Sequence, residues 1–256
     1  MFENELRLVV SGTRSTGKST TAEVLSIATG IPLARAMTAH EFLHDLVPGN
    51  QLAELSASEL STLGMRRLEE RMHKEATRSG SFIADGSVIH EWIYGVVRMQ
   101  IGVHPGPVLP EKLLKSVAGL PRRRVYRQYM EAYGTVAKAY AKSSCDGYIH
   151  LPVEFPLVPD GHGPVSEEFR KLSDELFVQT LNELKIPYLV VGGTIRQRID
   201  KIIDLFGLPL KMSLDDAISI GKGRVRRAAE LLEIKTRPRP AQRCPSKLRR
   251  IKCALR

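Results

Sequence analysis

The chain is poor in cysteine and in aromatic residues, and it has no long apolar run. Its 256 residues include one tryptophan and three cysteines, Cys145, Cys244 and Cys253. These cysteines lack metal-ligand spacing and are too few for a disulfide scaffold, so we expect free thiols in a reducing cytoplasm. No run of about 18 apolar residues is present to form a membrane-spanning helix. The acidic N-terminus does not fit an export signal either.

Positive charge is plentiful but unevenly distributed. The net charge is +10, yet 13 of the 38 Lys and Arg lie in residues 222–256 beside only Glu230 and Glu233. The rest of the chain is nearly neutral. Lys222 to Glu233 are compatible with a short basic helix, whereas Thr236 to Arg256 has three prolines and almost no apolar periodicity. We therefore expect a basic, disordered tail at 221–256 behind a single domain at 1–220. The tail has no aromatic residues to stack on bases, so any nucleic-acid binding through it would be unspecific.

The strongest motif is Gly12-Thr13-Arg14-Ser15-Thr16-Gly17-Lys18-Ser19, which fits the phosphate-binding pattern G-x-x-x-x-G-K-[ST]. An apolar strand at 6–10 precedes it and a helix at 19–28 follows it. Backbone N–H groups of such a turn, together with the positive end of the helix, bind a polyanion. Lys18 is expected to reach the β- and γ-phosphates and Ser19 to ligate Mg²⁺. The nucleotide-binding residues predicted here are Gly12, Thr13, Ser15, Thr16, Gly17, Lys18, Ser19 and Thr20.

Strands alternate with helices along the chain. Short apolar segments at 31–34, 81–85, 148–151 and 186–191 predict four further strands. Amphipathic segments at 58–79, 87–101, 122–143, 166–184 and 195–206 predict the helices between and after them. This order is typical of an α/β P-loop NTPase fold with a five-stranded, mostly parallel sheet and helices on both faces. Residues 36–57 and 98–127 are expected to be insertions on the substrate side.

Asp85 ends the predicted third strand, where ligands bind at the carboxyl edge of a parallel sheet. Its carboxylate fits two roles, a ligand to the water shell of Mg²⁺ or a base that accepts the proton of a substrate hydroxyl. The alternative is that Asp85 only caps the following helix. No zinc site is expected, although His40 and His44 are four residues apart.

Five further arginines and one glycine are candidates for the site. Arg170 follows a Pro- and Gly-rich loop and is the nearest cation for a lid over the triphosphate. Gly193 and Arg198 follow the fifth predicted strand, where a glycine turn and a stacking arginine suit an adenine ring. A basic cluster, Arg122, Arg123 and Arg127, suits an anionic substrate. Each also fits a purely structural interpretation, as surface charge or as a plain turn.

The order of these motifs resembles P-loop kinases of the AAA_28 type, relatives of the kinase domain of the bifunctional nicotinamide-nucleotide regulator, over residues 6–206. The resemblance rests on the phosphate loop, on Asp85, on Pro152 to Gly161 with its Asp-Gly ending, and on the Gly192-Gly193-Thr194…Arg198 turn. It implies ATP-dependent phosphoryl transfer with an acidic residue near the acceptor. Two departures stand out. Gly86 replaces the arginine that commonly follows the acidic residue, and His162-Gly163 replaces a lid arginine.

We therefore expect a cytoplasmic small-molecule kinase that uses ATP and Mg²⁺. Its acceptor is a hydroxyl or phosphate group of a nucleoside, a nucleotide or a specialised metabolite. The alternative is an ATPase or nucleotide-dependent switch that acts on a macromolecule, including nucleic acid through the basic tail. The helical faces suit either a core or the interface of a homodimer.

Overall fold

The computed structural model describes residues 5–38, 41–43, 57–101, 120–157 and 166–236. Five strands form one sheet in the order β2-β3-β1-β4-β5, and every neighbouring pair is parallel. The strands are β1 (Arg7–Ser11), β2 (Leu33–Ala34), β3 (Phe82–Asp85), β4 (Gly147–His150) and β5 (Tyr188–Val190). The α/β P-loop fold expected from the sequence is confirmed, with every predicted strand present.

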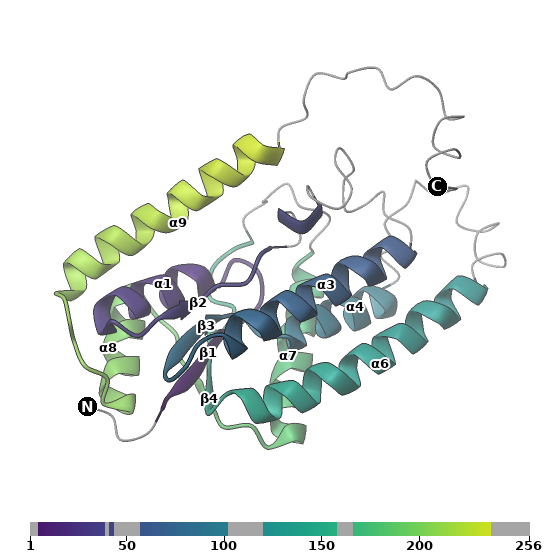
Figure 1. The fold of residues 1–256 in the computed structure, drawn as a ribbon, viewed down its shortest axis with the longest axis horizontal. Coiled ribbons are helices and arrows are strands. Elements are labelled where there is room, and N and C mark those ends of the chain that lie inside the picture. The colour runs from purple at the N-terminus through teal and green to yellow at the C-terminus, as the bar shows by residue number, and fades with distance from the viewer. Residues whose placement is uncertain (1–4, 39–40, 44–56, 102–119, 158–165, 237–256) are drawn as a thin grey trace.

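Helices cover both faces of the sheet (Figure 1). On one face lie α3 (Ala57–Ala76), α4 (Ile89–Ile101), α6 (Leu120–Ser144) and α7 (Glu167–Leu184). On the other lie α1 (Lys18–Thr29), α8 (Ile195–Phe206) and α9 (Leu214–Thr236). Each layer has its own apolar core, because side chains of the buried strands alternate between the two faces.

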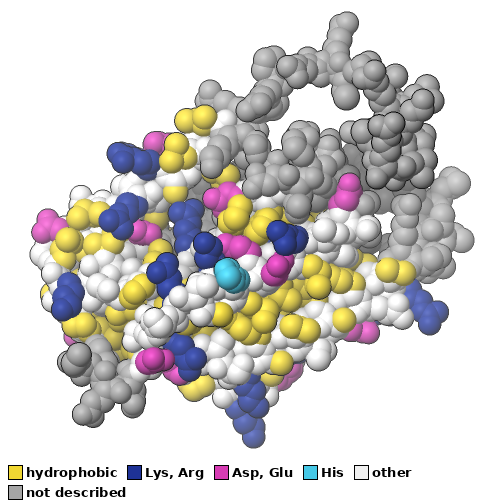
Figure 2. Space-filling model, in the orientation of Figure 1, with side chains coloured by type: hydrophobic (Ala, Val, Ile, Leu, Met, Phe, Trp, Pro, Cys, Tyr) yellow, Lys and Arg dark blue, Asp and Glu magenta, His cyan; other side chains and the backbone are white. Residues whose placement is uncertain are grey.

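Helix α9 crosses the boundary that the sequence predicts at residue 221. It begins at Leu214, runs to Thr236 and packs along α1, the helix that follows the phosphate loop. Gly221 permits this close approach, since a Cβ there would lie 2.5 Å from a methyl group of Val24. Basic side chains lie along its exposed surface (Figure 2). The helical part of the basic segment thus belongs to the folded body, and residues 237–256 lie outside the described residues.

The register brings the ends of three strands together. Val10 lies opposite Asp85, and Ser11 lies opposite His150. Ser11, Asp85 and His150 are the last residues of β1, β3 and β4, so they share the carboxyl edge of the sheet. The phosphate loop leaves β1 at this edge, which fixes the place of the candidate site.

Candidate functional site

The phosphate loop has the conformation that its glycines predict. Gly12 and Gly17 have φ of +137° and +87°, where a Cβ would be strained. At Gly12 a Cβ would also lie 2.6 Å from the carbonyl oxygen of Leu151. Gly17 is the N-cap of α1, and no side chain caps the helix there. The first N–H groups of α1 therefore point to a place where an anion can bind.

Lys18 is half-buried and held by the loop itself. Its Nζ donates a hydrogen bond of 2.6 Å to the carbonyl oxygen of Thr13, which also accepts one of 2.9 Å from the Thr16 hydroxyl. Burial lowers the pKa of Lys18 to about 8, against the opposing effect of the Asp85 carboxylate. A bound polyanion favours the charged form of this lysine. The loop residues thus fit the triphosphate that the motif predicts.

Asp85 lies half-buried beside this loop. Within the described part of the chain its carboxylate makes no hydrogen bond or ion pair, whereas its backbone carbonyl accepts one of 3.1 Å from Arg71. Helix α4 uses a different residue near its start: the Ser87 hydroxyl accepts from the N–H of Ile89 at 3.2 Å. The capping alternative therefore has no hydrogen bond to support it. Ser19 is exposed, so its hydroxyl and the Asp85 carboxylate suit a hydrated Mg²⁺.

Among the described residues, no cluster of three or more His, Cys, Asp or Glu side chains is arranged to hold a metal ion. No helix in the described ranges is long and apolar enough to cross a membrane.

Two buried histidines, His90 and His150, support the loop, and neither is among the predicted site residues. His90 on α4 accepts from the N–H of Ser87 at 3.0 Å through Nδ1, and its Nε2 lies 3.0 Å from the carbonyl oxygen of Gly12. Burial holds the pKa of His90 well below its usual range, so the ring is neutral and donates to Gly12. His150 lies beside Ser11, with 3.2 Å between its Nδ1 and the Ser11 hydroxyl.

Arg198 is buried under the loop rather than exposed for stacking on a base. Its guanidinium donates to the carbonyl oxygen of Thr16 at 2.6 Å and to the Glu154 carboxylate at 2.9 Å. One face lies over the Phe155 ring, 5.2 Å from the ring centroid. Glu154 also accepts from the N–H of Gly193 at 2.8 Å. That N–H and the Arg198 guanidinium hold the pKa of Glu154 below its usual range.

Replacing Arg198 with alanine is expected to weaken both the fold and ATP binding. The change removes a buried cation and leaves the Thr16 carbonyl and the Glu154 carboxylate without it, at a cost of about 2–4 kcal/mol of unfolding free energy. Urea unfolding and calorimetric ATP titration measure the two effects. Arg196→Ala is the matched control, because Arg196 lies on the same helix as Arg198 but is exposed. Its ion pair with Asp215 is a surface pair and is expected to contribute little. Equal behaviour of the two variants would contradict this role.

Arg170 lies at the loop but is fully buried, with 1% of its surface exposed. Its Nε donates to the carbonyl oxygen of Arg14 at 2.9 Å, and its Nη1 lies 3.4 Å from Glu167. Its Nη2 is buried and has no hydrogen-bond partner among the described residues. Arg170 thus brings a buried cation from α7 to the phosphate loop.

The predicted substrate residues are not brought to the loop by any contact that the structure describes. Arg127 is exposed on α6. Arg122 and Arg123 belong to the first turn of the same helix, but their side chains, like most of 36–57 and 98–127, lie outside the described residues. His162 and Gly163 lie outside them as well. Beside Gly86, Arg71 from α3 donates to the Gly86 carbonyl oxygen at 2.8 Å, so an arginine does reach this turn.

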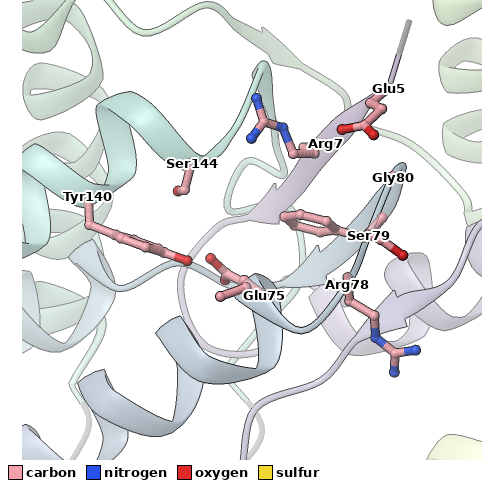
Figure 3. Close-up of a pocket in the computed structure, with 10 residues that line it drawn as sticks. Glu5, Arg7, Glu75, Arg78, Ser79, Gly80, Tyr140 and Ser144 are labelled. Atoms are coloured by element: carbon pink, nitrogen blue, oxygen red, sulfur yellow. The ribbon is translucent and has the colours of Figure 1, made fainter.

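A polar pocket of about 240 Å³ lies at the opposite edge of the sheet, where β1 and β3 begin (Figure 3). Glu75 and Tyr140 point toward each other in it, and burial raises the pKa of Glu75. None of the predicted site residues lines this pocket. The phosphate loop at the carboxyl edge is therefore the candidate site.

Comparisons with known proteins agree with this assignment of the fold. The AAA_28 family model, an AAA domain, matches residues 7–198. Deoxyadenosine kinase from M. mycoides with bound dATP has a TM-score of 0.52 and 16% identity, over 79% of this chain and 100% of that one. NadR in complex with NR has a TM-score of 0.53 and 15% identity, over 81% of this chain and 53% of that one. The chain thus spans about half of NadR. No curated protein sequence matches it.

Proposed function

Because the chain belongs to the AAA_28 family, we propose that it is a small-molecule kinase that transfers the γ-phosphoryl group of ATP. The observation that carries the proposal is the juxtaposition of the uncapped N-terminus of α1, Lys18 and the Asp85 carboxylate at one edge of the sheet. The kinase fold of deoxyadenosine kinase and of NadR supports it. A nucleoside or nucleotide-like acceptor is the class that these two neighbours suggest.

The residues divide the chemistry among themselves. The loop N–H groups and Lys18 bind the phosphates, and Arg170 brings a further cation to the phosphoryl group that moves. A Mg²⁺ ion held by Ser19, with Asp85 on its water shell, would neutralise charge on the phosphate oxygens. The acceptor oxygen forms a bond to the γ-phosphorus while the bond to the bridging oxygen of ADP breaks. The hydroxyl proton then passes to Asp85 or to solvent.

Catalysis of this kind depends on positioning more than on covalent chemistry. The site residues are held accordingly: His90 and Arg198 contact the carbonyl oxygens of Gly12 and Thr16, at the two ends of the loop. In this proposal Gly193 contributes through its N–H and Glu154 rather than through an open adenine-stacking turn.

The function is tested by ATP consumption of the purified full chain with Mg²⁺, with and without pools of nucleosides, nucleotides and other hydroxyl metabolites. We expect ADP release to rise with one pool and a phosphorylated product to form. The Lys18→Ala variant controls for contaminating activity. ADP release that is indifferent to every pool contradicts the kinase and supports an ATPase or switch.

A further inference from the structure

Helix α7 contacts the phosphate loop and its strand through one face. Arg170, Asp174 and Phe177 are spaced i, i+4 and i+7, so they lie above one another on the helix. Arg170 donates to the carbonyl oxygen of Arg14, inside the loop. Asp174 lies one turn further along, with its Oδ1 3.3 Å from Nε2 of His150. Helix α7 carries Arg170, the cation proposed to face the transferred phosphoryl group. It thus makes a second contact near the loop, with His150 at the end of β4.

His150 carries this second contact to the residue before the loop. Its Nδ1 lies 3.2 Å from the hydroxyl of Ser11, and Ser11 is followed directly by Gly12. Ser11 and His150 are 0% and 1% exposed. A serine, a histidine and an aspartate in this order resemble a nucleophilic triad, but a buried serine cannot attack a substrate. The array has a positioning role instead.

Phe177 packs against both histidines where α7 meets the start of the loop. We call this contact the seam; it comprises Arg170, Asp174 and Phe177 of α7 together with His90, His150 and Ser11. The centroid of the Phe177 ring lies 4.4 Å from that of His90 and 5.5 Å from that of His150. Since His90 holds the carbonyl oxygen of Gly12, the seam reaches both Ser11 and Gly12. Movement of α7 would therefore displace the histidines that contact Ser11 and Gly12 at the start of the loop.

Three buried polar atoms along the seam lack hydrogen bonds. They are Nη2 of Arg170, Oδ1 of Asp174 and Nε2 of His150, counted among the described residues. A buried polar atom without a partner costs about 1–3 kcal/mol. A nucleotide-bound state in which these atoms are paired is therefore stabilised. A phosphoryl oxygen is the complement of Nη2. The carboxylate and the imidazole are already 3.3 Å apart, so a small change in their relative orientation lets them share a hydrogen bond.

We propose that Asp174 and His150 are positioning residues for phosphoryl transfer. They fix α7 to the end of β1 so that Arg170 faces the phosphoryl group that is transferred, and the seam tightens when nucleotide binds. The inference rests on the proposed kinase function. Asp174 makes no hydrogen bond to the loop among the described residues, and its charge acts on Lys18 less than that of Asp85 does. Its removal is therefore expected to slow the transfer more than it weakens ATP binding.

The test compares Asp174→Ala with Glu175→Ala, the next residue of α7, which is exposed and pairs with Lys171. We expect Asp174→Ala to lower kcat about 10- to 100-fold while the KM for ATP changes less than about threefold. Glu175→Ala is expected to behave like the wild type. Asp174→Glu is expected to recover part of the loss, and His150→Phe, which retains the ring packing on Phe177, is expected to match Asp174→Ala.

Hydrogen exchange with a non-hydrolysable ATP analogue and Mg²⁺ gives a readout that does not depend on turnover. In the wild type we expect the analogue to slow exchange in α1 and α7, and in Asp174→Ala to slow it in α1 alone. Wild-type kcat together with wild-type protection of α7 in Asp174→Ala would overturn the inference. Should this variant not fold, Asp174→Asn takes its place under the same criterion. Absence of any phosphorylated product from the wild type refutes the proposed kinase instead, and the exchange result still decides the seam.

Discussion

Replacing Lys18 with alanine is expected to lower kcat/KM for ATP by about two to three orders of magnitude and to leave the protein folded. The ammonium group is the one cation of the loop motif that the pattern places on the β- and γ-phosphates. Among the described residues it donates one hydrogen bond, to the carbonyl oxygen of Thr13. Loss of that hydrogen bond costs about 1 kcal/mol, which thermal unfolding would detect as a small shift.

The matched control is Lys171→Ala, since Lys171 is exposed on α7 and pairs only with Glu175 in the described residues. This control is expected to bind and consume ATP like the wild type. Calorimetric titration with ATP and Mg²⁺ measures binding for all three proteins. An unchanged ATP affinity in Lys18→Ala would show that the loop is not a triphosphate cradle.

The same lysine gives ATP binding a pH dependence. Its pKa is lowered by burial to about 8 in the free protein, and bound phosphates favour the charged form. Below pH 8 the lysine is already charged. Above pH 8 it must take up a proton on binding, so the ATP affinity is expected to fall with rising pH in the wild type. In Lys18→Ala this fall is expected to disappear.

The sequence predicts the fold well because each element carries a local signal. Period-two and apolar runs mark the strands, and helix α7 begins where Ser166 predicts it, with the Ser166 hydroxyl accepting from the N–H of Phe169. Gly12 and Gly17 fix the loop through their own backbone conformation. These signals depend on residues close in the chain, which is why they can be read without a structure.

The contacts that support the loop have no such signal. Arg198 is 182 residues from Thr16, and His90 is 78 residues from Gly12. An arginine on an amphipathic helix is usually a surface charge, so its burial under the loop depends on the whole sheet being assembled. His150 ends a strand at the carboxyl edge, and its position alone was a usable hint. Asp174, in the middle of a helix, offered none.

The basic C-terminal segment contains a longer helix than its composition indicates. The composition allows a short basic helix at 222–233 within a solvated tail that starts at residue 221, because charge dominates over apolar residues. Yet Ala217, Ile218 and Gly221 form a small-residue and apolar face that lies on α1, and the helix continues through the basic residues to Thr236. Packing of the first turns on α1 gives the rest of the helix a nucleus to extend.

Replacing Asp85 with asparagine is expected to reduce turnover about 10²- to 10⁴-fold while changing the affinity for ATP by less than about threefold. Asparagine retains the shape of the side chain but lacks its negative charge. It therefore binds the water shell of Mg²⁺ less strongly and cannot accept the proton of the acceptor hydroxyl. The fold is expected to persist, because the hydrogen bonds that hold this turn involve backbone atoms: Arg71 donates to the carbonyl oxygens of Asp85 and Gly86. Ser87→Ala is the control for helix capping and is expected to lower the unfolding midpoint instead.

The two roles open to Asp85 separate in the same variant. If the carboxylate holds the water shell of Mg²⁺, half-maximal turnover of Asp85→Asn needs more Mg²⁺ than the wild type. If it accepts the proton, the Mg²⁺ requirement is unchanged and the acid limb of the pH–rate profile is lost. Turnover within about threefold of the wild type would contradict both, and a protein that unfolds would return Asp85 to the role of a helix cap. Asp85 pairs with Val10 of β1, the strand that leads into the phosphate loop. Either a higher Mg²⁺ requirement or a lost acid limb would therefore show that the acidic group of this site lies at the end of β3.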